Sequence, residues 1–216
     1  MTLKRLLTIT LVAGLGLGSS AARAQQAPGN NANYQLVVNG QPMEVEAGKE
    51  FTVTTPKGET VRLEVREKTV RTFQDSWVTF QLPAKISVAE TDQEGIRQLV
   101  LMNATGAGMI IQEYTGVDPA DVIDFMIAQL IKDESKAGYK MSEKPYSLKL
   151  TDGKQLRGKT KTLSQKNKQM VYNLGAWSGE NEGVLVVAFQ TMDSSPDDKT
   201  NQQLIDDVLK TLKIRR

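Results

Sequence analysis

Basic side chains recur at every second position of one predicted strand, as Arg157, Lys159 and Lys161 within residues 154–163. Residues two apart in a β-strand project from the same face, so this spacing predicts a single basic strip. Such a strip would suit an anionic partner, for example a lipid head group, a wall polymer or an acidic protein. A solvated strand face, or an edge strand whose lysines prevent pairing with other chains, gives the same pattern. That second interpretation is the simpler one.

Aromatic side chains provide a second candidate for binding, because aromatic residues are enriched at interfaces. Tyr146, Tyr172 and Trp177 fall in predicted strands, where they are equally suited to a half-buried position in a sheet. Together with the basic strip, they define the candidate binding residues Arg157, Lys159, Lys161, Tyr172 and Trp177.

Two short stretches have the composition of ligand-binding loops. Asp193, Asp197 and Asp198 offer hard oxygen ligands for Ca²⁺, but their spacing is not that of an EF-hand loop. The Gly-rich residues 105–108 lie between two predicted strands, whereas a phosphate loop needs a helix after its glycines. We therefore interpret residues 105–108 as a hairpin turn, and we predict no metal site and no cofactor.

The chain has 216 residues and contains neither histidine nor cysteine. This composition excludes disulfides, Ser-His and Cys-His catalysis and most zinc sites. Asp121 and Asp124 form a carboxylate pair on the wet side of a predicted helix, which is typical of solvation rather than of catalysis. We expect a protein that is not an enzyme, and we name no catalytic residue.

The N-terminus has the three parts of a secretory signal peptide. Lys4-Arg5 is the positive region, Leu6–Gly18 the apolar region, and Ala22-Arg23-Ala24 a small-residue cleavage site. The apolar run is shorter than the ~20 residues of a membrane-spanning helix. We therefore expect cleavage after Ala24, an exported protein that is periplasmic or secreted, and no transmembrane segment after cleavage.

Loss of residues 1–24 would also remove Lys4, Arg5 and Arg23 and leave a chain close to neutrality. A nearly neutral chain has no broad electrostatic attraction for nucleic acid, so we expect no nucleic-acid partner. Residues 25–33 are polar and predict a flexible N-terminus.

Residues 34–67 predict a small antiparallel β meander, which begins with a hairpin at Asn39-Gly40. Residues 69–216 predict the main domain, in which one long helix follows a strand at residues 108–114. Asp118-Pro119 begins this helix and Gly138 ends it. Four strands come next, and Thr200 with Gln203 predicts the capping box of a closing helix. The expected fold class is α+β, an antiparallel sheet with a long central helix and a C-terminal helix packed on it.

The order of elements in residues 69–216 resembles the PsbP-like superfamily. The resemblance rests on the strand Trp77–Pro83, the helix predicted at Asp118–Ala137, the meander that reaches Gln190 and the terminal amphipathic helix. It implies a non-catalytic role in binding or assembly and identifies no functional residue.

We therefore expect an exported protein of the cell envelope that binds or assembles other components. The partner would be an envelope protein or an anionic envelope component. One alternative is a small-ligand carrier with a cavity between the long helix and the sheet, for which a deep pocket with convergent polar groups would be the sign. The other is a His-free hydrolase, which would require a buried carboxylate with a raised pKa beside a cleft.

Overall fold

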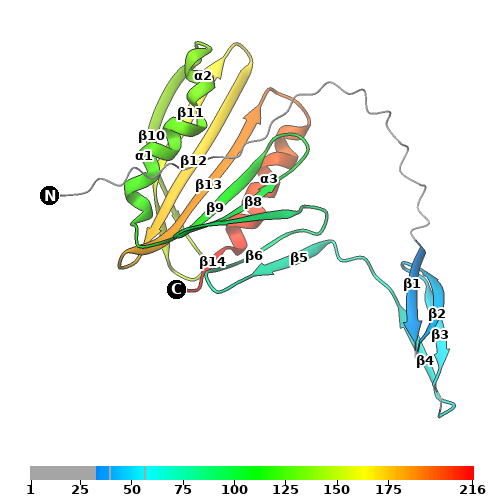
Figure 1. Ribbon diagram of the computed structural model, residues 1–216. Helices are drawn as coiled ribbons and strands as arrows, with labels where there is room; N and C mark the ends of the chain where they lie inside the picture. The colour runs from blue at the N-terminus through cyan, green and yellow to red at the C-terminus, as the bar shows by residue number, and fades with distance from the viewer. Residues whose placement is uncertain (1–32, 39, 56) are drawn as a thin grey trace. The chain divides into compact units, whose positions relative to one another are not determined.

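The computed structural model describes residues 33–38, 40–55 and 57–216 (Figure 1). The predicted signal peptide, most of the flexible N-terminus and Asn39 of the first hairpin turn lie outside these residues. The chain divides after Glu67 into two compact units, and each is described by itself. We call residues 33–67 the hairpin unit and residues 68–216 the sheet unit.

The hairpin unit contains two separate antiparallel hairpins. Strand β1 (Asn33–Val38) pairs with β2 (Gln41–Glu46), and β3 (Glu50–Thr54) pairs with β4 (Thr60–Glu64). Burial alternates along β3, as expected for a strand with one face toward solvent.

The sheet unit is built on a seven-stranded antiparallel sheet in the order β10-β11-β12-β13-β9-β8-β7. Strand β13 contains the continuous apolar run Val184–Phe189 and lies near the centre of the sheet, as its composition predicted. The strands are β7 (Val88–Gln93), β8 (Ile96–Met102), β9 (Gly108–Thr115), β10 (Lys140–Lys149), β11 (Gln155–Gln165), β12 (Lys168–Ser178) and β13 (Glu182–Met192).

The predicted long central helix is wrong. This stretch forms a 3-10 turn, η1 (Pro119–Val122), and two short helices, α1 (Ile123–Leu130) and α2 (Lys132–Lys136). Asp118 does cap the first turn, where its Oδ1 accepts the amide of Ala120 at 2.9 Å. The helix is interrupted at Ile131, whose φ of −106° and ψ of 11° lie outside helical geometry. Ile131 is 7% exposed, and burial of this β-branched side chain accompanies the break.

The predicted α+β class is also wrong, because strands hold 54% of the described residues and helices 18%. The mostly-β composition conflicts with the α+β domain that the PsbP-like resemblance implied. The closing helix α3 (Asp197–Thr211) starts three residues before Thr200, the start of the predicted capping box. Its N-cap residue is Pro196, which makes no side-chain capping hydrogen bond. A short strand that the sequence pattern did not indicate, β14 (Lys213–Ile214), follows it and completes a three-stranded sheet with β5 (Val70–Gln74) and β6 (Val78–Pro83).

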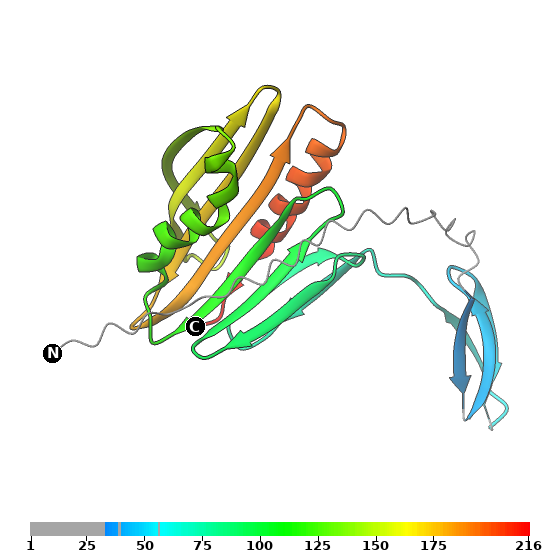
Figure 2. The ribbon, with the colours of Figure 1, turned by 45° about the horizontal axis from the view of Figure 1, so that its top comes forward.

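Two apolar cores lie on opposite faces of the seven-stranded sheet (Figure 2). Alternate residues of β9 and β13 enter each core, so these two strands are buried on both sides. The first core is covered by α3 and the three-stranded sheet, and we call that side the α3 face. The second core is covered by α1, and we call that side the α1 face.

Gly183, at the start of β13, is a position where packing allows no side chain. A Cβ there would lie 2.3 Å from the carbonyl oxygen of Trp177 and 2.6 Å from Cγ of Pro119 in η1. We predict that Gly183→Ala lowers the free energy of unfolding by about 1–3 kcal/mol, because the added methyl overpacks this contact. Urea denaturation would measure the change. Gly179→Ala is the matched control, since its nearest contact would be an ordinary 3.4 Å, and an equal loss in both variants would contradict the prediction.

Candidate functional site

The predicted basic strip lies on the α1 face of β11, and acidic side chains of other elements neutralise much of it. Nζ of Lys159 lies 2.6 Å from Oδ1 of Asp124 in α1 and 3.4 Å from Glu143 in β10. Lys161 lies 3.3 Å from the same Glu143. The hydrogen bond to Asp124 raises the pKa of Lys159. Arg157 donates two hydrogen bonds to Oε1 of Gln155, at 3.2 and 3.0 Å.

The two candidate aromatic residues lie on opposite faces of the sheet. Tyr172 belongs to the core under α1 and stacks with Phe189 at a centroid distance of 6.4 Å. Burial raises the pKa of Tyr172 to about 12. Trp177 packs against the other core, and the ammonium of Lys154 lies 5.4 Å from its ring centroid. The structure therefore does not bring Tyr172 and Trp177 together in one site.

Sequence reasoning missed a cluster of charged residues on the α3 face. Oδ2 of Asp75, in the β5–β6 turn, accepts a 2.6 Å hydrogen bond from Nη1 of Arg97. The same nitrogen donates to Oε2 of Glu113 at 3.3 Å, while Nη2 of Arg97 donates to Glu90 at 2.7 Å. We call Asp75, Glu90, Arg97 and Glu113 the carboxylate cluster. It joins the three-stranded sheet to β7, β8 and β9.

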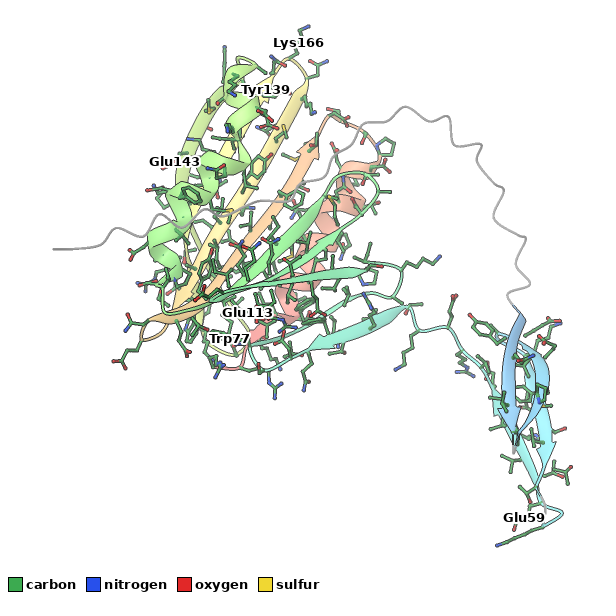
Figure 3. All side chains as sticks on the ribbon, viewed as in Figure 1. Glu59, Trp77, Glu113, Tyr139, Glu143 and Lys166 are labelled. Atoms are coloured by element: carbon green, nitrogen blue, oxygen red, sulfur yellow. The ribbon has the colours of Figure 1, made fainter. Side chains whose placement is uncertain are left out.

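Glu113 is the buried member of the carboxylate cluster, with a side chain only 1% exposed (Figure 3). Burial raises its pKa to about 7, and the neighbouring charge of Asp75 acts in the same direction, whereas Arg97 lowers it. Among the described residues, its Oε1 atom has no hydrogen-bond partner. Glu113 can therefore gain or lose a proton near neutral pH.

The contacts of Asp75 identify the cluster as part of the framework. Its Oδ1 accepts the backbone amides of Trp77 and Val78, both at 2.7 Å, and this holds the turn into β6. The sequence did carry a signal for the cluster. Arg97 and Glu113 lie two residues from the buried Leu99 and Ile111, and so on the same face of β8 and β9 as these core residues.

Two grooves lie on the surface of the sheet unit, and both involve α3. The first, of about 420 Å³, lies between the start of α3 and the end of β6, and its lining includes Pro83, Ile86 and Leu204. The second, of about 370 Å³, lies at the C-terminal end of α3 and is lined by Thr72, Thr79, Phe80, Gln81, Thr151, Lys210, Thr211 and Lys213. Neither groove includes a residue of the carboxylate cluster or any of the five candidate binding residues.

The acidic stretch considered for calcium makes local hydrogen bonds. Asp193 accepts the amide of Ser195 at 3.1 Å, and Asp198 accepts the amide of Ser194 at 3.0 Å. Across residues 33–38, 40–55 and 57–216, no group of three or more acidic side chains could hold a metal ion. Within the same ranges, none of the helices has the length and apolar character to cross a membrane.

No protein-family model matches the chain, and no curated protein matches it. These comparisons do not bear on the resemblance to PsbP-like proteins, whose implied α+β domain conflicts with the mostly-β fold.

Titration of Glu113 makes the stability of the sheet unit depend on pH. Its folded pKa of about 7 exceeds the usual 4.5, so the folded protein holds a proton that the unfolded chain releases between these values. We predict that the free energy of unfolding falls as pH rises from about 4.5 to about 7, by at most about 1.4 kcal/mol per pH unit from this group. Urea denaturation across that pH range would measure the slope.

Glu113→Gln should flatten this slope, because the amide does not titrate. Glu90→Gln is the control, since Glu90 contacts the same Arg97 with a side chain that is 48% exposed. If the free energy of unfolding of Glu113→Gln changes with pH as steeply as that of the unmodified protein, Glu113 is not the source of the pH dependence.

Proposed function

We propose that the protein is an exported, non-catalytic binding or assembly protein of the cell envelope. In this proposal the hairpin unit is the docking module and the sheet unit is its support. The observation that carries the proposal is the unequal burial of the two units. Of the buried apolar side chains among the described residues, only Val45 belongs to the hairpin unit.

The hairpin unit presents apolar side chains that its own strands leave accessible. Val37 on β1 is 60% exposed and Val61 on β4 is 39% exposed. Most of its remaining apolar strand residues are only half-buried: Tyr34, Leu36, Val38, Met43, Phe51, Val53 and Leu63. A β unit of this size, without a disulfide or a metal, usually requires further burial to be stable. A partner surface would supply that burial.

Ion pairs of the hairpin unit contribute little to its stability. The pairs Lys49–Glu46 and Arg62–Glu50 join side chains that are 45% to 77% exposed. Exposed pairs of this kind add only small amounts of stability because solvent screens them.

The sheet unit, by contrast, has the burial expected of a support. Both of its apolar cores consist entirely of residues from 68–216, and they include strands, α1 and α3. The space under α1 is filled by Met126 and Ile127, which are 2% and 6% exposed. This packing favours a docking protein over a carrier with a cavity between that helix and the sheet.

The carboxylate cluster is the feature that bears on the hydrolase alternative. The carboxylate of Asp75 accepts hydrogen bonds from two backbone amides and from Arg97. The guanidinium of Arg97 forms ion pairs with three carboxylates. These contacts support a structural role for the cluster, which favours binding over catalysis.

Affinity capture from envelope extract would test the docking module. We predict that the full chain captures a partner and that the double variant Val37→Glu/Val61→Glu loses it, because charges replace the exposed apolar contacts. Thr52→Glu/Thr60→Glu is the matched control, since it adds the same charge at exposed positions of β3 and β4. Capture that survives the valine substitutions, or substrate turnover by the purified protein in a broad hydrolase screen, would contradict the proposal.

A further inference from the structure

The groove at the C-terminal end of α3 is lined by three parts of the chain that are distant in the sequence: the β5–β6 hairpin, the β10–β11 turn, and the end of α3 with β14. Thr72 comes from β5, Gln81 from β6, Thr151 from the β10–β11 turn, and Lys210 and Lys213 from the end of α3 and β14. Its volume of about 370 Å³ lies within the range of small-molecule sites. We call it the Thr/Lys groove.

The Thr/Lys groove is lined by hydrogen-bond donors that the protein itself leaves unused. Within the described residues, the ammonium groups of Lys210 and Lys213 lie in no ion pair. The hydroxyls of Thr72 and Thr151 and the side-chain amide of Gln81 likewise have no partner in that part of the chain. By contrast, the hydroxyl of Thr79 donates to the carbonyl of Phe73 at 3.1 Å.

No carboxylate lines the groove, and the acids nearest to it in sequence, Asp152 and Asp207, form hydrogen bonds elsewhere. Oδ2 of Asp152 accepts the amide of Ile214 at 2.7 Å, and its Oδ1 accepts the amide of Lys154 at 3.0 Å. Asp207 accepts a 2.6 Å hydrogen bond from Gln203, one turn back on α3. The charge that faces the groove is therefore positive.

The carbonyl end of a helix repels anions, and α3 ends at this groove. Two carbonyls near its end already accept hydrogen bonds within the protein, however. The hydroxyl of Thr211 lies 3.0 Å from the carbonyl of Asp207 and 3.1 Å from that of Val208, and the latter also accepts the amide of Leu212 at 2.9 Å. The two lysines counteract the remaining negative dipole.

The backbone around the groove is held in place by long-range contacts. Strand β14 pairs Lys213 with Thr79, and the hydroxyl of Thr211 accepts the amide of Gln81 at 2.9 Å. Nζ of Lys154 donates to the carbonyl of Ile214 at 2.7 Å. These contacts position the donor-bearing segments before any ligand arrives, and preorganisation of this kind lowers the entropic cost of binding.

We propose that the Thr/Lys groove binds the phosphoryl group of a phosphorylated small molecule or lipid head group. A phosphate monoester carries close to two negative charges and only acceptor oxygens, which match two ammonium groups and three neutral donors. The groove is larger than a phosphate alone needs, so it has space for the group that carries the phosphate. This site is independent of the docking module on the hairpin unit.

Calorimetric titration of the full chain with glycerol 3-phosphate and with inorganic phosphate tests whether the ligand is a soluble phosphorylated molecule. Sodium chloride at equal ionic strength is the control titrant. Co-sedimentation with phosphatidylcholine vesicles, with and without phosphatidic acid, tests the lipid source. We expect saturable binding in at least one arm. We also expect Lys210→Gln/Lys213→Gln to weaken that binding at least about tenfold, because it removes both charges of the groove.

Lys140→Gln/Lys144→Gln is the matched control, because it removes two exposed lysines of β10 that do not line the groove. This control should bind like the unmodified protein. Binding to glycerol 3-phosphate that depends on Lys210 and Lys213 identifies a soluble ligand, and dependence seen only with phosphatidic acid identifies a lipid head group. Absence of saturable binding in both arms, or an equal loss in both double variants, overturns the proposal.

Discussion

The pairing of β9 with β13 is the interaction on which the sheet unit depends. It runs from Phe189 opposite Gly108 to Glu182 opposite Thr115 and joins two groups of strands that η1, α1 and α2 separate in the sequence. Both strands are buried on both faces, so each face requires a cover, and α1 and α3 supply one each. On its other side β9 pairs closely with β8, where a Cβ at Gly108 would lie 2.2 Å from the carbonyl oxygen of Leu101.

The three-stranded sheet is attached to this framework at two places. At one, Asp75 reaches Arg97 of β8 while holding the amides that start β6. At the other, the backbone of Ile214 is bonded through both its amide and its carbonyl to the β10–β11 turn. The first attachment joins charged side chains that are largely buried, with Asp75 11% and Arg97 26% exposed. In such positions a bond between charged partners is strong and a lone charge is costly. The second attachment adjoins Thr151 and Lys213, which line the Thr/Lys groove.

The two units differ in what they bury, and this difference organises the functional proposal. The sheet unit has two complete cores of its own, so its surface features can serve binding without a cost to its stability. The hairpin unit has accessible apolar side chains and almost no core. In the proposal, a partner that binds the folded hairpin unit would therefore stabilise it.

By itself, the sequence determined the local elements of this protein, whereas only the tertiary structure decided its helix layout and its charge pairs. The hairpin at Asp152-Gly153 and the central position of Val184–Phe189 were predictable, because turn chemistry and apolar runs act over a few residues. The sequence also predicts that Tyr172 and Trp177 lie on opposite faces of the sheet, because residues an odd number apart on one strand project to opposite faces. The break at Ile131 was not predictable, because it depends on packing against the sheet. The ion pairs Lys159–Asp124 and Asp75–Arg97 were not predictable either, because their members are distant in sequence and come into contact only in the folded structure.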